Sequence, residues 1–187
     1  GIIDEVKLYN RALTASEVLK EYAALAKQRP AKKVPEAQAE EGLLGYYPLS
    51  ETTGTTAHDI SGNDSHGKLV NVIWKQGEGG SAAEFNGRNS YITIPHKPKL
   101  NRREAITLQA LVKLTTVDGD HGFISKGRGT WGSGYTFQQV NGSLQLGLNT
   151  TVRPGEGIKA NGYNLQTDPV IKAGEWTFVA ATYDSSE

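Results

Sequence analysis

The sequence lacks both cysteine and methionine among its 187 residues. Without cysteine the chain can form neither a disulfide framework nor a thiolate metal site. It also has no run of about 18 apolar residues, so no membrane-spanning helix is expected. Lysine plus arginine and aspartate plus glutamate both number 20. This balance gives no basic field that would attract nucleic acid, so nucleic acid is not expected as a partner.

The two ends of the sequence predict a fragment. The chain begins Gly1-Ile2-Ile3-Asp4 rather than with methionine, and no charged, apolar leader typical of a signal peptide follows. At the other end it stops at Glu187, directly after an apolar, β-branched segment. We therefore expect a piece of a longer protein.

A stretch rich in proline and alanine divides the sequence into two parts. Residues 28–41 read QRPAKKVPEAQAEE, a composition that cannot build a packed face and predicts a linker. Before it, residues 2–9 predict a short strand. Thr14 followed by Glu17 predicts a capping box that starts a helix at Ala15.

After residue 42 the pattern changes to short apolar segments separated by Gly, Asn and Asp. Strands are expected over residues 43–49, 70–75, 83–86, 90–94, 106–115, 122–125, 135–140, 144–148 and 176–183. Asn141-Gly142 predicts a two-residue hairpin turn, and residues 149–173 predict loops with at most one edge strand. The fold class expected is all-β: an antiparallel β-sandwich preceded by a short strand and one helix.

The loop His58–Gly67 reads HDISGNDSHG and concentrates side chains typical of tight, irregular turns. Oxygen atoms that converge from such a loop are the ligands that calcium prefers. Composition alone leaves three interpretations open, namely a metal site, a catalytic carboxylate cluster and a simple turn.

Five segments also match known motifs in their residues and in their order. They are Gly1–Leu13, Gly42–Leu49, the loop with its Asp-x-Ser-Gly-Asn-x-x-His-Gly pattern, residues 85–92 and residues 174–180. Together they resemble the laminin G-like, concanavalin A-like lectin/glucanase jelly-roll domains of bacterial secreted proteins. In that family the first segment is a closing strand and the second is an opening strand.

The resemblance implies that the end of one repeat precedes the beginning of the next. Residues 1–27 would be the closing strand and helix of a preceding laminin G-like repeat, and residues 28–41 the linker. Residues 42–187 would be a laminin G-like jelly-roll domain, truncated at its C-terminus. Neighbouring domains of the same larger chain are then expected partners, and a secreted or cell-surface location is implied.

The resemblance also implies a structural calcium ion where the two ends of the domain meet. Asp59 is the expected ligand, with Asn63 and Asp64 assisting, and Asp4 of the closing strand is a further candidate. A related hypothesis lets residues 2–8 fold back through the linker and fill the place of the homologous closing strand. Asp4 would then approach Asp59.

Catalysis is not expected. Residues 127–132 satisfy GxGxxG, but a strand pattern follows them, whereas a dinucleotide site needs a helix there. Glycoside hydrolysis, the enzyme alternative within the same superfamily, needs two suitably spaced carboxyl groups, and the sequence has no such run on one strand. No catalytic residues are assigned, and a fragment of a glycoside hydrolase is the less favoured alternative.

The expected function is therefore non-catalytic binding or adhesion within a larger exported protein, with carbohydrate or an extracellular protein as the partner. Trp131 lies among glycines, where an aromatic ring can stack on a sugar. The candidate ligand residues in the long loop are Tyr163, Asn161, Asn164 and Asp168. Protein–protein adhesion or a structural spacer repeat is the alternative.

Overall fold

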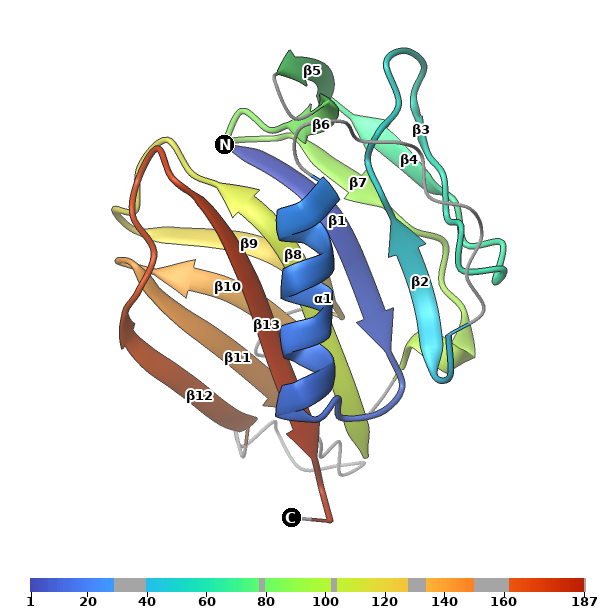
Figure 1. Cartoon of the computed structure of the whole chain (residues 1–187), viewed down its shortest axis with the longest axis vertical. Coiled ribbons are helices and arrows are strands. Elements are labelled where there is room, and N and C mark those ends of the chain that lie inside the picture. Colours follow the sequence, from blue (N-terminus) through green and yellow to red (C-terminus); the bar gives the residue numbers. More distant parts are fainter. Residues whose placement is uncertain (29–39, 78–79, 102–103, 128–133, 150–161, 187) are drawn as a thin grey trace, which may run out of the picture.

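The structure is a computed structural model that describes residues 1–28, 40–77, 80–101, 104–127, 134–149 and 162–186. It is a sandwich of two β layers with one helix on the outer side of the first layer (Figure 1). In the described ranges the structure has no helix of the length and apolar character needed to cross a bilayer. The expected all-β antiparallel sandwich of the jelly-roll type is confirmed.

The first layer is a six-stranded sheet. Its strands are β1 (Ile2–Tyr9), β2 (Leu43–Tyr47), β5 (Ile73–Gly77), β6 (Gly80–Glu84), β8 (Ala105–Lys113) and β13 (Trp176–Asp184). They follow the order β13-β8-β1-β6-β5, and β2 also pairs with β1. β1 therefore lies in the middle, antiparallel to β8 on one side and to β2 and β6 on the other.

The second layer consists of two smaller sheets. The four-stranded sheet contains β9 (Asp120–Lys126), β10 (Gly134–Val140), β11 (Ser143–Asn149) and β12 (Gly162–Pro169), in the order β12-β11-β10-β9. The three-stranded sheet contains β3 (Thr56–Ala57), β4 (Gly67–Val70) and β7 (Tyr91–Thr93), and a 3-10 turn follows at Pro98–Leu100. Side chains of both layers, such as Leu108 and Phe137, form one buried core.

A bulge in β1 adapts this strand to its central position. The pairing register with β8 shifts between Asp4 and Lys7, and Glu5 has a positive φ of 51°. The extra residue gives the strand a local kink. Asp4 and Glu5 are both buried at this point, each 4% exposed. The strand thus joins the sheet formed by the residues after the linker, as the fold-back hypothesis proposes; its origin in a preceding repeat stays a prediction.

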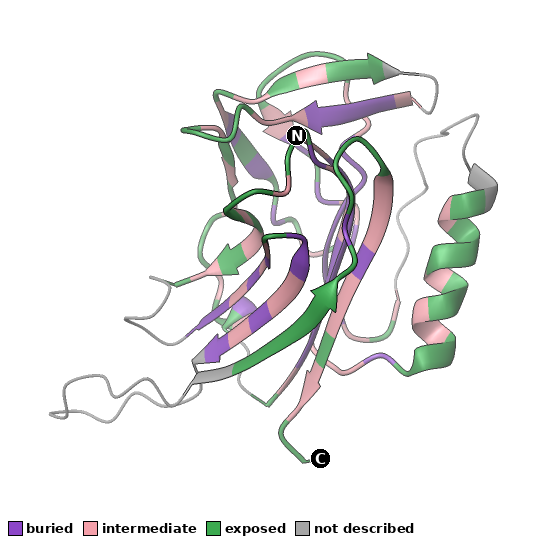
Figure 2. Cartoon of the chain, turned by 90° about the vertical axis from the view of Figure 1, so that its left-hand side faces the viewer, coloured by how far each residue is buried: buried purple, intermediate pink, exposed green. Residues whose placement is uncertain are grey.

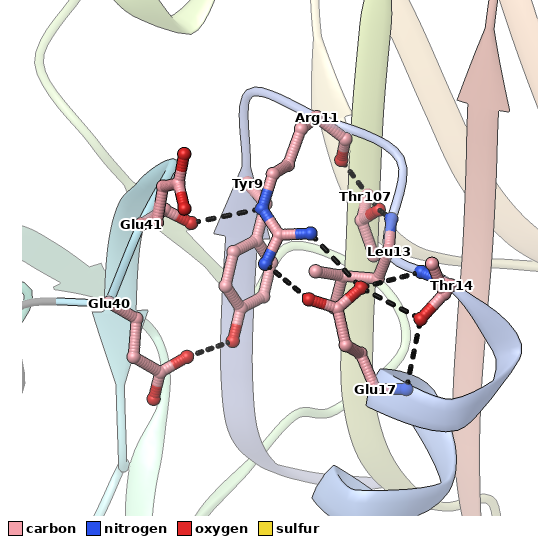
Figure 3. Close-up of polar contacts among 8 residues, drawn as sticks. All are labelled: Tyr9, Arg11, Leu13, Thr14, Glu17, Glu40, Glu41 and Thr107. Carbon is pink, nitrogen blue, oxygen red and sulfur yellow. Dashed lines mark hydrogen bonds and ion pairs between the residues drawn. The ribbon is translucent and has the colours of Figure 1, made fainter.

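The helix α1 (Ala15–Gln28) begins where the capping box predicts. The Thr14 N–H donates to Glu17 Oε2 (2.8 Å), and the Glu17 N–H donates to Thr14 Oγ1 (3.3 Å) (Figure 3). The Arg11 guanidinium also donates two hydrogen bonds to this carboxylate, and with those from Thr14 it lowers the pKa of Glu17 to about 2. The helix stands outside the sandwich and exposes most of its surface (Figure 2).

The segment that leads into α1 buries a polar face of β8. Thr107 and Gln109 alternate with the core residues of this strand, and they are 0% and 1% exposed. The Leu13 N–H donates to Thr107 Oγ1 (2.9 Å), and the Thr107 hydroxyl donates to the Arg11 carbonyl (2.8 Å). The polar alternation in the sequence therefore marks a buried docking surface rather than a solvated face.

Most expected strands are confirmed within two or three residues, with two differences. The segment 70–75 is divided between β4 and β5, because Asn71 has a positive φ of 52° and interrupts the extended backbone. The two-residue β3 was not expected. The Asn141-Gly142 turn is confirmed by φ values of 49° and 87°. Among the described residues of the segment 149–173, β12 is an edge strand.

Replacing Thr107 by valine is expected to lower the free energy of unfolding by about 1–3 kcal/mol, because the buried Leu13 N–H loses its acceptor. Thr182→Val is the matched control, since Thr182 lies opposite Thr107 in the register but is exposed. Urea unfolding followed by circular dichroism measures both. Equal losses in the two variants would contradict the docking role of Thr107.

Candidate functional site

Asp59 organises the loop His58–Gly67 through its carboxylate, which is buried at 6% exposure. Asp59 Oδ1 accepts the main-chain N–H groups of Tyr46 (3.0 Å) and Ser61 (3.0 Å), and Oδ2 accepts that of Ser65 (2.9 Å). Burial raises the pKa of the Asp59 carboxyl, but these hydrogen bonds outweigh it and hold the pKa below its usual value. The carboxylate thus fixes the loop against β2.

The two histidines of the loop bond to its frame. The Asp59 N–H donates to His66 Nδ1 (3.0 Å). His58 lies within 3.0 Å of Glu51 through Nδ1, and the two imidazole rings meet edge to face at 5.5 Å. Loop closure therefore involves side chains from both of its ends.

Two lysine ammonium groups donate hydrogen bonds to oxygen atoms on the other side of the loop. Lys97 Nζ donates to the carbonyls of Asn63 (2.7 Å) and Asp64 (2.6 Å). Lys99 Nζ donates to Asn63 Oδ1. Each lysine thus contacts oxygen atoms that the calcium hypothesis assigns to the ion.

The oxygen atoms of this loop are not arranged to bind a calcium ion in this conformation. Both Asp59 oxygens already accept N–H groups, the Asp64 side chain is 88% exposed beside His66, and lysines hold the Asn63 oxygens. Calcium needs six to eight oxygen ligands. In the part of the chain that the structure describes, no three Asp, Glu or His side chains form a group that could hold a metal ion. Calcium binding stays an untested prediction that this geometry does not support.

Glu5 of β1 meets the loop through Tyr46. The Tyr46 hydroxyl donates to Glu5 Oε2 (2.6 Å), while the Tyr46 N–H donates to Asp59. Asp4 is buried and lies opposite Leu111 of β8. The first strand and the loop therefore meet through Glu5 and Tyr46. The expected approach of Asp4 to Asp59 stays a prediction.

The predicted ligand residues are only partly placed. Trp131 and Asn161 lie outside the described residues. Tyr163 occupies a β12 position opposite Leu148. Asn164 and Asp168 are exposed on the same strand, and a register shift separates the positions of these two residues.

The outer face of the four-stranded sheet carries uncharged polar side chains. Tyr135, Phe137, Leu146 and Leu148 point into the core, so their neighbours along β10 and β11 point outward. The residues paired with these outward positions on β9 and β12 lie on the same face. We call this surface the amide face, and its polar side chains are Ser125, Thr136, Gln138, Gln145, Asn164 and Gln166.

The glutamines of the amide face form a ladder across three strands. Gln138 Nε2 donates to Gln145 Oε1 (2.6 Å), and Gln145 Nε2 reaches Gln166 Oε1 at 3.4 Å. Gly122 lies opposite Gln138 on β9, and Gly147 lies two residues after Gln145 on β11, both at outward positions. A Cβ atom added to either would meet nothing closer than 3.9 Å. The face thus combines oriented amide groups with open space above two glycines.

Part of the amide face could have been found from the sequence. The Asn141-Gly142 turn fixes the hairpin register, which places Gln138 opposite Gln145 on the side away from the apolar residues. Gln166 had no comparable signal, because its strand was not resolved within the long segment before residue 173. The lysines that hold the loop lie more than thirty residues after Asn63, which they contact, so no local pattern shows them.

A sequence model of the concanavalin A-like lectin/glucanases superfamily, of the laminin G type, matches residues 86–187, more than half of the chain. The chain belongs to this superfamily. Comparisons with curated proteins and with solved structures gave no match. At the level of the superfamily the protein is a lectin-like binding domain, for which carbohydrate or protein is the suggested class of partner.

Asp59→Asn is expected to destabilise this lectin-like domain by about 2–4 kcal/mol, since a buried amide cannot accept all three N–H groups. The lowered pKa means that the carboxylate contributes stability above about pH 4 and loses it as the pH falls through the folded-state pKa. Urea unfolding between pH 2.5 and 6 should therefore show that the free energy of unfolding falls less with acidification in Asp59→Asn than in the wild type. Asp64→Asn, at an exposed carboxylate, is the control.

Calcium is expected to leave the thermal unfolding temperature unchanged within about 1 °C, because lysines and main-chain groups hold the loop oxygens. If a site existed, calcium at a hundred times its dissociation constant would add about 2.7 kcal/mol to the free energy of unfolding. The unfolding temperature would then rise by several degrees. Scanning calorimetry in EDTA and in calcium chloride compares the two cases. A rise that disappears in Asp59→Ala would restore the calcium interpretation.

Proposed function

We propose that the protein is a non-catalytic carbohydrate-binding module that holds polyhydroxylated ligands on the amide face. The glutamine ladder is the observation that carries the proposal. Amide and hydroxyl groups offer both donors and acceptors, as sugar hydroxyls require, and the sheet holds them at strand spacing. Membership of the lectin/glucanases superfamily supports the same ligand class.

The chemistry of the amide face supports binding rather than hydrolysis. Its six side chains are amides and hydroxyls, whereas glycoside hydrolysis uses a pair of carboxyl groups across the scissile bond. We accordingly propose no catalytic residues. Action within a larger protein at the cell surface or outside the cell belongs to the same proposal and rests on the family resemblance.

Gln145→Ala is expected to weaken glycan binding at least about tenfold, because it removes the middle of the ladder, which contacts both neighbouring glutamines. A glycan array with the 187-residue chain selects a ligand, and titration calorimetry then compares the variants. Gln76→Ala is the matched control, since Gln76 is an exposed glutamine of β5 in the other layer.

The same experiment separates the alternatives. Equal affinity of Gln145→Ala and wild type for a bound glycan would remove the amide face from the proposal. A wild-type chain that binds no glycan on the array would favour a protein partner or a spacer role. Mass spectrometry of the bound oligosaccharide after incubation tests the absence of catalysis, because any cleavage product contradicts it.

A further inference from the structure

Gly147 of β11 is a strand glycine that neither the backbone conformation nor the packing of the protein requires. Its φ lies outside the left-handed region that favours glycine. Among the described residues, a Cβ atom added here would meet only the Thr136 carbonyl oxygen, at 3.9 Å, which is an ordinary van der Waals distance. A residue with a side chain would therefore fit at this position.

Other strand glycines have a local reason. A Cβ atom at Gly67 would lie 2.5 Å from a methyl group of Ile92, and one at Gly134 would overlap the Lys126 carbonyl group. Gly122 of β9 has open space above it, but it borders the register shift between β9 and β10. Close packing or a bulge thus accounts for each of these three glycines.

The strand around Gly147 is regular. Gly147 pairs with Thr136 of β10 and with Asn164 of β12, and the residues on either side of it keep the same register. Glycine weakens the interior of a strand and usually marks a bulge, a bend or a place where a ligand or another backbone approaches closely. Regular pairing excludes a bulge at Gly147. The open space above this residue therefore points to close approach from outside the sheet.

Three polar side chains of the amide face surround the open space over Gly147. β11 lies between β10 and β12 (Figure 1), so Thr136 and Asn164 stand on either side of Gly147, about 9.5 Å apart across two strand spacings. Gln145 lies two positions earlier on the same side of β11. Hydroxyl and amide groups offer both donors and acceptors. The position thus combines bare main chain with hydrogen-bonding groups on three sides.

The amide face carries no charged side chain in the two rows that cross its four strands. The first row contains Ser125, Thr136, Gly147 and Asn164, and the second contains Gly122, Gln138, Gln145 and Gln166. The next outward position on β9 is Asp120, which is exposed. An anionic ligand would therefore meet a carboxylate, and none of the described residues in these rows offers a cation.

We propose that Gly147 is the floor of a subsite that holds one ring of an uncharged pyranose glycan against the main chain of β11. The absent side chain lets the ring approach the sheet, where hydroxyl groups on its two sides bond Thr136 and Asn164 and a third reaches Gln145. Uncharged hexoses are the ligand class, because the rows offer amide and hydroxyl groups but no counter-ion for a carboxylate or a sulfate. This inference rests on the proposed function and adds the residue of the amide face that determines specificity.

Gly147→Val fills the space over the main chain and is expected to weaken glycan binding at least about tenfold. The probes are the methyl glycosides of glucose, galactose and mannose, titrated into the whole 187-residue chain. NMR follows the main-chain amides of Thr136 and Asn164, and at least one glycoside should shift them saturably in the wild type. Thr93→Val is the matched control, because Thr93 is an exposed residue of β7 outside the amide face and its replacement should leave binding unchanged.

Thermal unfolding of Gly147→Val separates a ligand-binding glycine from a structural one. Valine is favoured in strands, and the space at this position is open, so the unfolding temperature should not fall. A fall of several degrees would show that the fold itself requires glycine here, which contradicts the proposal.

The charge of the ligand provides an independent test. The methyl glycosides of glucuronic and galacturonic acid carry a carboxylate in place of the hydroxymethyl group of the glucoside and the galactoside. They are expected to bind at least about tenfold more weakly, because the carboxylate would lose water without gaining a cation. Equal or tighter binding of a uronic acid would overturn the assignment of an uncharged ligand.

Failure of the subsite is distinguishable from failure of the proposed function. Wild-type affinity in Gly147→Val, together with weaker binding in Gln145→Ala, would remove the subsite and leave the amide face in place. A wild-type chain that binds a glycan of the array but none of the three glycosides would likewise overturn the single-ring subsite alone. Binding of no glycan at all would remove both the subsite and the proposed function.

Discussion

The position of β1 is the constraint on which the rest of the structure depends. In the order β13-β8-β1-β6-β5 it is the strand that connects the two halves of the six-stranded sheet. Its pairing with β8 joins residues about a hundred positions apart, so a large loop must close before this contact forms. The core and both layers therefore rely on correct insertion of the first strand.

The outward side of β1 is held by buried polar contacts rather than by an apolar face alone. Lys7, 7% exposed, contacts Glu21 of α1 (2.8 Å) and Glu40 (3.0 Å), and its ammonium lies over the Tyr46 ring. The Tyr9 hydroxyl donates to Glu40 as well (Figure 3). Buried ion pairs are costly to desolvate, so their clearest effect is to define which partners meet. Here they bring together the first strand, the helix and the residues just before β2.

Local signals predicted local structure well, and long-range contacts account for what the sequence could not show. The capping box at Thr14 and the turn at Asn141-Gly142 depend on neighbours, and both are confirmed. The role of Asp59 depends on which groups fold against it. Its carboxylate oxygens accept hydrogen bonds from main-chain N–H groups. The sequence alone was equally compatible with a metal ion at these oxygens. The burial of Thr107 likewise requires a segment almost a hundred residues away.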